Sequence, residues 1–436
     1  LNKINLVSKG IPKSIMAQRT KIRNGARSGL VTAVDVGSTK IACFIGQATT
    51  EGGIEIVGIG HQLARGMRNG NITDMDAVEH SIRMTVEAAE QMAGENVSEV
   101  TVCISGGVPD SKLISFDVSI SGHEIGDADL KRALDPVWLH AQQSADRQVI
   151  HTLPVGYSID GNRGVRDPRG MFGEKLGVNM HVMTAAASAM RNLESCIHRC
   201  HLEIESIVIA PYAAGMSCLV ADEKELGSIC IDMGGGTTTV SVFFDGEVLF
   251  VDSLPVGGAH VTNDIARGLS APVAYAERMK TLYGSANSTP SDDKEHFKIP
   301  LVGEEESGSN QVPRSMLVGI IRPRIEEIFE LLRDRLDETG FNKIAGRRVV
   351  LTGGASQLTG VGELASAILD KQVRLGRPVN ITGLADSANG PAFSVCAGLI
   401  DFALSDRSEA AVPTTRSLEA PVGRFGRLGQ WLRENI

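Results

Sequence analysis

The stretch that most constrains this chain is residues 229–244, which read ICIDMGGGTTTVSVFF. A run rich in β-branched residues ends on an acid, and three glycines, three threonines and a second β-rich run follow. Glycines let a backbone turn sharply beside a ligand, and successive N–H groups in such a turn form a concavity that binds anions. An ordinary hairpin turn requires only one or two glycines. The pattern therefore predicts a phosphate-binding hairpin whose acid holds Mg²⁺ through water; its residues are Asp232, Gly234, Gly235, Gly236, Thr237 and Thr238.

A second segment, residues 34–46, repeats this arrangement with the sequence VDVGSTKIACFIG. Both segments consist of a strand, an Asp-x-Gly turn, hydroxyl side chains and another strand. Such an internal repeat predicts two similar α/β domains, each offering a phosphate-binding hairpin to a shared cleft. The predicted metal ligand of this copy is Asp35, and the predicted phosphate ligands are Gly37, Ser38, Thr39 and Lys40.

Residues 348–355 (RVVLTGGA) form a third junction of strand and glycines. Here Gly353 and Gly354, followed by Ala355, let the backbone lie against a base or an α-phosphate, with a helix N-terminus pointing at the ligand. Small residues at 213–215 and 397–398 predict a close crossing of two helices between the lobes, which is a natural hinge.

Periodicity predicts several further elements. Apolar residues recur at helical spacing over 74–93, with Thr73 as the N-cap, and over 324–339. Residues 106–179 contain short β-like runs, many turn residues and one helix near 127–144, which predicts an inserted subdomain. Residues 285–314 are rich in Ser, Pro and acids, and we expect a disordered loop there.

Charge is distributed unevenly along the chain. The net charge is −9, yet residues 1–28 hold seven basic residues and no acid, so the remainder has 36 basic against 52 acidic residues. A body this acidic is a poor nucleic-acid binder, because phosphate contacts dominate that affinity. We expect residues 1–28 to be a disordered basic extension, with a contact to a membrane or partner as the alternative.

Seven cysteines lie mostly inside apolar runs, and none forms a C-x-x-C pair. This usage is typical of reduced, buried thiols. A metal site at Cys196, His198, Cys200 and His201 is the alternative to a core helix there. The core helix is favoured, because Cys196 and Cys200 stand four residues apart on one helical face.

The C-terminal residues suggest a tethered membrane contact. Residues 405–421 are polar and contain prolines, which predicts a linker. Residues 422–436 have the composition of an interfacial helix; a helix docked on the protein or on a partner is the alternative. Its apolar positions include Val422, Phe425, Leu428, Trp431 and Leu432, and its arginines are Arg424, Arg427 and Arg433. No apolar run reaches the length of a membrane span, and no secretory signal is expected.

The order of these motifs resembles that of actin-like ATPases, and the chain is identified as a member of the FtsA family. The hairpins at 35–40 and 232–237 resemble the two phosphate motifs, and TGGA at 352–355 resembles the adenosine motif. AERMK at 276–280 resembles the segment whose Glu and Lys contact ribose and adenine, which implies these roles for Glu277 and Lys280. RGM at 65–67 and RPVNITG at 377–383 are similar to FtsA in particular. The insertion after the strand at 97–105 is similar to the displaced subdomain of FtsA.

The resemblance implies a function as well as a fold. It implies an α/β, actin-like two-lobed ATPase fold with an extra subdomain, and ATP and Mg²⁺ as cofactors. It implies filaments of this chain at the cytoplasmic face of the inner membrane during cell division. The implied partners are the FtsZ C-terminal tail, anionic lipid and other divisome proteins, without nucleic acid. Arg314 and Arg324 are the expected contacts for acids of that tail.

One position departs from the hydrolytic relatives. An acid commonly precedes the Pro of the first interlobe helix and positions water, but here Ala210 precedes Pro211. Phosphoryl transfer depends on such positioning, so we expect at most weak Mg-dependent ATPase activity, with ATP acting mainly as a conformational ligand. A sugar-kinase-like enzyme and a pilus-assembly scaffold are the alternative functions.

These considerations divide the chain into seven kinds of segment. The expected ranges are 1–28 for the basic extension, 29–97, 180–204 and 379–404 for the first lobe, 98–179 for the inserted subdomain, 205–260 and 347–378 for the second lobe, 261–346 for its upper subdomain, 405–421 for the linker and 422–436 for the amphipathic helix.

Overall fold

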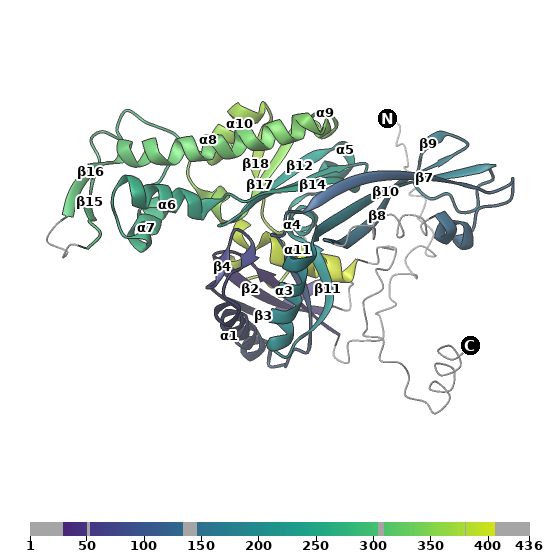
Figure 1. Cartoon of the computed structure of the whole chain (residues 1–436), viewed down its shortest axis with the longest axis horizontal. Coiled ribbons are helices and arrows are strands. Elements are labelled where there is room, and N and C mark those ends of the chain that lie inside the picture. The colour runs from purple at the N-terminus through teal and green to yellow at the C-terminus, as the bar shows by residue number, and fades with distance from the viewer. Residues whose placement is uncertain (1–28, 50–52, 134–145, 304–308, 380, 406–436) are drawn as a thin grey trace, which may run out of the picture. The chain divides into compact units, whose positions relative to one another are not determined.

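The computed structural model describes residues 29–49, 53–133, 146–303, 309–379 and 381–405 (Figure 1). The chain divides into two compact units. The larger unit contains the described residues of Leu1–Asp110 and Ala185–Ser405, and the smaller one contains Ser111–Thr184. The predicted basic extension, the linker after Ser405 and the amphipathic helix lie outside the described residues.

The first sheet of the larger unit contains the hairpin expected from residues 34–46. Across the sheet the strand order is β11, β6, β1, β2, β3. Strand β2 pairs antiparallel with β1 and with β3, whereas β1, β6 and β11 run parallel. The bounds are β1 Leu30–Val36, β2 Lys40–Ala48, β3 Ile54–Leu63, β6 Glu99–Ile104 and β11 Glu203–Ile209.

The second sheet of this unit has the same topology. Its order is β18, β17, β12, β13, β14. Strand β13 pairs antiparallel with β12 and β14, and β12, β17 and β18 run parallel. The two sheets therefore correspond strand for strand, which confirms the predicted internal repeat. The bounds are β12 Ser228–Met233, β13 Thr238–Phe244, β14 Glu247–Leu254, β17 Arg348–Thr352 and β18 Gln372–Leu375.

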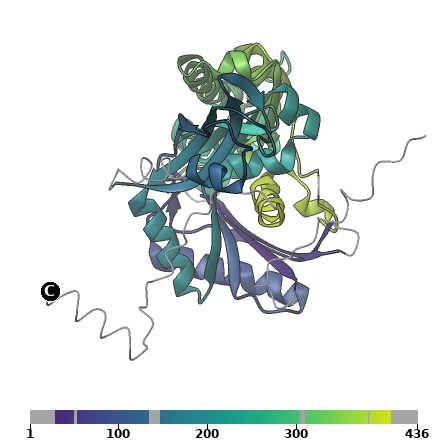
Figure 2. The same ribbon diagram turned by 90° about the vertical axis from the view of Figure 1, so that its right-hand side faces the viewer.

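Two helices of small residues lie between the sheets, as the yellow helix in Figure 2 shows for α11 (Ser394–Leu404). Its partner is α4 (Ala210–Cys218), every residue of which is buried. An ideal Cβ built on Gly398 would lie 1.8 Å from the carbonyl oxygen of Ala213, so only glycine permits this approach. The predicted close crossing is confirmed.

The outer faces of the sheets are covered by amphipathic helices. In the first lobe α1 packs on β2 and β3, and α3 packs on α1 and β11. In the second lobe one apolar core joins the sheet to α6, α7, α8 and α10. The helix bounds are α1 Met75–Ala93, α3 Ala187–Arg199, α5 Ala221–Leu226, α6 Gly258–Gly268, α7 Val273–Tyr283, α8 Arg314–Glu338, α9 Phe341–Ile344 and α10 Val361–Leu369.

Short elements connect these parts. A small hairpin follows β3, and three 3₁₀ turns lie in the second half of the chain. They are β4 Met67–Arg68, β5 Asn71–Ile72, η1 Gly354–Gln357, η2 Asp386–Ala388 and η3 Pro391–Phe393.

Three expectations about local structure are wrong. The N-cap of α1 is Asp74, whose carboxylate accepts from the backbone N–H of Ala77, while the hydroxyl of Thr73 donates to the Gly66 carbonyl. Helix α8 begins at Arg314 and continues through Pro323 instead of beginning after it. Proline removes one N–H and disfavours a helix interior, but the turns before it bury Leu317 and Ile321 in the lobe core, and this packing overrides the local preference.

The third correction concerns the loop expected over 285–314. Strands β15 (His296–Pro300) and β16 (Ser309–Pro313) form an antiparallel hairpin there. Two features that stabilise this segment are not evident from its polar composition. Ile299 is buried against the lobe core, and the buried carboxylate of Asp292 accepts from Arg314 Nη1 at 2.8 Å.

The smaller unit has its own sheet and core. The strand order is β7, β10, β8, β9, and residues 127–133 are helical. Side chains including Ile120, Ile125, Leu176 and Met180 form its apolar core. The bounds are β7 Asp110–Ser119, β8 Arg147–Ile159, β9 Asn162–Val165 and β10 Lys175–Ala186.

Candidate nucleotide site

The two predicted phosphate hairpins adopt the same turn. In the first, the N–H of Gly37 donates to the Lys40 carbonyl at 3.1 Å, and in the second the N–H of Gly234 donates to the Thr237 carbonyl at 2.9 Å. A Cβ on Gly37 would lie 2.6 Å from that Lys40 oxygen. Glycine is therefore a steric requirement at the start of this turn.

The tips of the two hairpins meet. An ideal Cβ on Gly235 would lie 2.3 Å from Thr39 Cγ2, and one on Gly236 would lie 2.4 Å from Ser38 Oγ. The hydroxyl side chains of one hairpin thus occupy the space left by the glycines of the other. The structure brings together the backbone N–H groups and hydroxyls that the sequence predicted as phosphate ligands.

Asp35 and Asp232 precede the two hairpin turns as a pair of partly buried carboxyl groups. Burial and the charge of Asp35 raise the pKa of Asp232 to about 7. Burial also raises the pKa of Asp35, against the opposing effects of a hydrogen bond from Cys103 Sγ at 3.0 Å and of Lys40. Two carboxylates that repel each other in a dry site are stabilised by a cation.

This donor set fits Mg²⁺, which binds oxygen ligands and retains several waters. Among the residues that the structure describes, no group of three or more His, Cys, Asp or Glu side chains could hold a metal directly. The result also favours a core helix at Cys196 and Cys200, both of which lie on or at the end of α3.

The amino group of Lys40 contacts the segment that leads into α11. It donates to the Ala392 carbonyl and lies 3.3 Å from the centroid of the Phe393 ring. Burial lowers the pKa of Lys40, and the charges of Asp35 and Asp232 oppose this shift. Lys40 therefore balances the charge of the carboxyl pair.

The predicted nucleoside residues gather beside the second hairpin. Lys280 Nζ donates to Glu277 Oε2 at 2.7 Å, to Thr262 Oγ1 at 2.8 Å and to the Gly258 carbonyl at 3.0 Å. A Cβ on Gly258 would lie 3.1 Å from Ala355 Cβ. The start of α6, helix α7 and the turn after β17 thus share one corner of the site.

Gly353 joins this corner to the carboxyl pair. Its φ is +85°, and a Cβ there would lie 2.3 Å from Asp232 Oδ1. The helix expected after Gly353 and Gly354 is a single 3₁₀ turn, because α10 begins only at Val361. A helix N-terminus does follow Gly353, as predicted, but it belongs to this 3₁₀ turn and not to an α-helix.

Several neighbours of the site were missed by the sequence reading. The N–H groups of Gly258 and Ala259 donate to the carbonyls of Gly234 and Gly235 at 2.9 and 2.8 Å, which fixes the second hairpin on α6. The glycine pair 257–258 after β14 was the available signal. Cys103 and Thr262 carried no signal in the sequence.

Both arginines expected at a partner surface are engaged within the second lobe. Arg314 pairs with Asp292, and Arg324 Nε contacts Asp264 Oδ2 at 2.6 Å. Their side chains are 20% and 29% exposed. The terminal residues predicted to contact a membrane (422–436) lie outside the described residues, and none of the described helices has the length and apolarity of a membrane span.

Known proteins have the same architecture as this chain. The family model described as "Cell division protein FtsA" matches residues 229–398, and that of the "SHS2 domain inserted in FTSA" matches residues 106–184. The chain is 45% identical over 431 residues to the cell division protein FtsA of Rhizobium meliloti (strain 1021), covering 96% of this chain and 97% of that relative.

Solved structures share the fold at low sequence identity. A PilM–PilN type IV pilus biogenesis complex matches with a TM-score of 0.62 and 15% identity, covering 86% of this chain and 98% of that chain. MreB 5 of Spiroplasma citri bound to AMPPNP matches with a TM-score of 0.52 and 12% identity, covering 86% and 96%. The expected actin-like α/β fold with an inserted subdomain is confirmed, and this chain belongs to the FtsA family of cell division proteins.

Proposed function

We propose that this chain binds ATP with Mg²⁺ between its lobes, polymerises on the inner membrane and tethers FtsZ filaments to it during cell division. One observation carries the nucleotide part of the proposal. Two glycine hairpins, each preceded by a partly buried aspartate whose pKa is raised, meet tip to tip beside Gly353. The AMPPNP in the MreB structure agrees with a nucleotide in this fold.

We assign a role to each group of site residues. Gly37, Ser38, Thr39 and Lys40 with Gly234 to Thr238 hold phosphates through N–H, hydroxyl and ammonium donors. Asp35 and Asp232 hold Mg²⁺ through water, and the ion neutralises phosphate charge. Gly353, Gly354 and Ala355, with Glu277 and Lys280, hold the nucleoside. The lobe and subdomain ranges expected from the sequence are part of the same proposal.

Hydrolysis at this site is proposed to be slow. Ala210 is the first residue of α4 and is buried, so no carboxylate stands at the position where hydrolytic relatives orient water. Positioning supplies much of the acceleration in phosphoryl transfer. ATP then acts mainly by holding one arrangement of the lobes.

Anchoring is proposed to depend on assembly. A short amphipathic helix gives marginal membrane binding by itself, and a filament presents many such helices to one surface. We assign this role to residues 422–436 behind the linker at 405–421. The site of action is the cytoplasmic face of the inner membrane, and the smaller unit is assigned to other divisome proteins.

The FtsZ tail is proposed to bind the upper part of the second lobe, over residues 261–346. Arg314 and Arg324 are the proposed contacts for acids of the tail. Each already has a carboxylate partner, so the tail must compete with Asp292 or Asp264. Binding through Arg324 involves the more exposed of the two ion pairs.

The experiment is liposome co-sedimentation with Mg-ATP and vesicles that contain anionic lipid. The full chain is compared with one ending at Arg416, with Leu432→Asp on the apolar face and with Gln430→Asp on the polar face. We expect the full chain and Gln430→Asp to pellet, and the truncated chain and Leu432→Asp to stay in the supernatant. Equal pelleting of all four proteins would remove the terminal anchor and favour the basic residues 1–28.

A pilus-assembly scaffold is the second candidate, and the PilM–PilN likeness favours it. Such a scaffold has no tethered terminal helix. Direct binding of the FtsZ tail would exclude it, as it would exclude a kinase of the same fold, which requires phosphorylation of a sugar or another small acceptor.

A further inference from the structure

The loop between β3 and α1 touches the first phosphate hairpin. The N–H of Gly70 donates to Ser38 Oγ at 2.8 Å. An ideal Cβ on Gly236 would lie 2.4 Å from the same Ser38 oxygen and 3.0 Å from the backbone nitrogen of Asn69. Ser38, the second hairpin and this loop therefore meet at one point.

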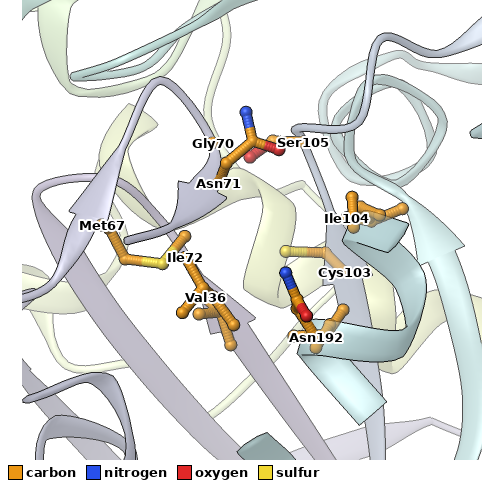
Figure 3. A pocket seen from close by; sticks show the side chains of 11 residues that line it. Val36, Met67, Gly70, Asn71, Ile72, Cys103, Ile104, Ser105 and Asn192 are labelled. Atoms are coloured by element: carbon orange, nitrogen blue, oxygen red, sulfur yellow. The ribbon is translucent and has the colours of Figure 1, made fainter. Parts of the chain in front are cut away.

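The same loop also holds the chain where it leaves the larger unit. Asn71 Oδ1 accepts from the N–H of Gly107 at 3.1 Å. A Cβ on Gly106 would lie 2.2 Å from the Gly70 carbonyl oxygen, so the two backbones are in contact. Figure 3 shows the Asn71 side chain beside Ser105 at the rim of a pocket.

The outgoing and returning connections of the smaller unit are joined at this point. The N–H of Ala186, at the end of β10, donates to the carbonyl of Gly107 at 2.8 Å. A Cβ on Gly107 would lie 2.9 Å from Ala189 Cβ on α3. Ser38 is thus linked to Gly107 and Ala186 by three hydrogen bonds and by the peptide bond between the consecutive residues Gly70 and Asn71.

The loop has room to move. A cavity of about 30 Å³ separates Met67, Asn71 and Ile72 from Cys103, Ile104 and Asn192 (Figure 3). A close-packed interface transmits strain and resists small shifts, whereas a cavity of this size has space for a water and for movement of its walls. On this side the loop is therefore less tightly packed than a segment without a cavity beside it.

We propose that Ser38, this loop and Asn71 transmit the presence of a terminal phosphate to the two connections of the smaller unit. The inference rests on the proposed nucleotide site. A hydroxyl that donates to a phosphate oxygen is held in one orientation and still accepts from Gly70. Because Asn71 follows Gly70 directly, fixing Gly70 also restricts the position of Asn71. A triphosphate therefore holds the bonds at Gly107 and Ala186 closed more often than a diphosphate does.

The test is hydrogen exchange at the Gly107 and Ala186 amides of the full chain, with Mg²⁺ and either ADP or AMPPNP at saturation. One hydrogen bond of ordinary net strength predicts about fivefold slower exchange with AMPPNP. Asn71→Ala removes the acceptor for Gly107 and should leave less than a twofold difference. Asn71→Asp retains that acceptor, and Asn192→Ala makes the same truncation on the opposite wall of the cavity. Both should retain the difference seen in the unaltered chain.

Nucleotide affinity is measured on the same samples, which separates the two proposals. If both nucleotides bind and exchange at the two amides is equal, the relay is wrong and the nucleotide site stands. The relay is also wrong if Asn71→Ala responds as the unaltered chain does. If neither nucleotide binds, the proposed site fails and the relay fails with it.

Discussion

Asp232 makes the folded chain less stable at neutral pH, yet its carboxylate is needed for the proposed binding of Mg-ATP. Its pKa is raised to about 7 by burial and by Asp35, and so lies above the unfolded value near 4. The folded state therefore takes up a proton, and this stabilising contribution is complete below pH 4 and lost as the pH rises through 7. We predict that, without nucleotide, Asp232→Asn has a higher free energy of unfolding than the unaltered chain. This gain should be larger at pH 8 than at pH 5 by roughly 2–3 kcal/mol.

The same substitution should weaken Mg-ATP binding about tenfold or more, because a neutral amide cannot replace a carboxylate beside Mg²⁺. Denaturant unfolding at the two pH values and nucleotide titration measure the two effects. Asp334→Asn, at a side chain that is 61% exposed, serves as the control and should change neither quantity. An equal difference in stability between this variant and the unaltered chain at pH 5 and pH 8 would contradict the raised pKa of Asp232.

At the same scale, sequence patterns predicted residues with local roles better than residues with distant partners. The turns at Gly37 and Gly234 need glycine because of contacts within four consecutive residues, so the local sequence was sufficient to predict them. Thr73 and Asp74 are both acceptable caps, and only the fold decides that Asp74 caps α1. Lys40 meets Phe393, 353 positions away, and no local pattern could indicate that contact.

Among the elements, the segment before β15 is joined to α8 by the buried carboxylate of Asp292, which pairs with Arg314. The pKa of Asp292 is lowered first by the N–H of Thr289, which donates at 2.8 Å, and also by Arg314. The lowered pKa gives stability that is present above pH 4 and lost as the pH falls through the folded value. We predict that Asp292→Asn lowers the free energy of unfolding by about 1–2 kcal/mol at pH 7 and by less at pH 2, where Asp292 becomes protonated.

Thermal unfolding at both pH values measures this effect, and Asp293→Asn at the exposed neighbouring position is the matched control. An equal loss at pH 7 and pH 2 would show that the amide fails for steric reasons. Because Arg314 pairs with Asp292, Arg314→Ala should also destabilise the chain, so a loss of FtsZ-tail binding by that variant alone would be ambiguous.

Elements defined by periodicity were predictable, and elements defined by tertiary packing were not. The apolar stripe Ile325, Ile328, Leu332 and Leu336 of α8 is buried as predicted. The turns of α8 before Pro323 and the hairpin after Asp292 exist because they pack on the second lobe, which local composition does not reveal. The tail-binding assignment rests on the same part of the chain and stays a prediction.

For the whole molecule, the repeated Asp-x-Gly hairpin was enough to predict two matching sheets, because each hairpin requires the same strands to support it. How closely the lobes approach depends on α4 and α11. The small residues at that crossing let the two backbones come into direct contact, since a Cβ on Gly398 would lie 1.8 Å from the Ala213 carbonyl oxygen. No space for a larger side chain remains there. The lobes can share one ligand only while this approach is maintained.

We therefore predict that Gly398→Ala separates the lobes. It should lower the free energy of unfolding by about 2–4 kcal/mol, since overpacking at a rigid backbone contact cannot relax easily. It should also weaken Mg-ATP binding about tenfold, because the proposed phosphate ligands come from both sides of the crossing. Gly319→Ala in α8 is the matched control, since a Cβ there meets no atom within 4 Å, and it should be neutral or stabilising by up to ~1 kcal/mol. Denaturant unfolding and nucleotide titration of both variants decide the point: unchanged affinity in Gly398→Ala would mean that the nucleotide is held by one lobe alone.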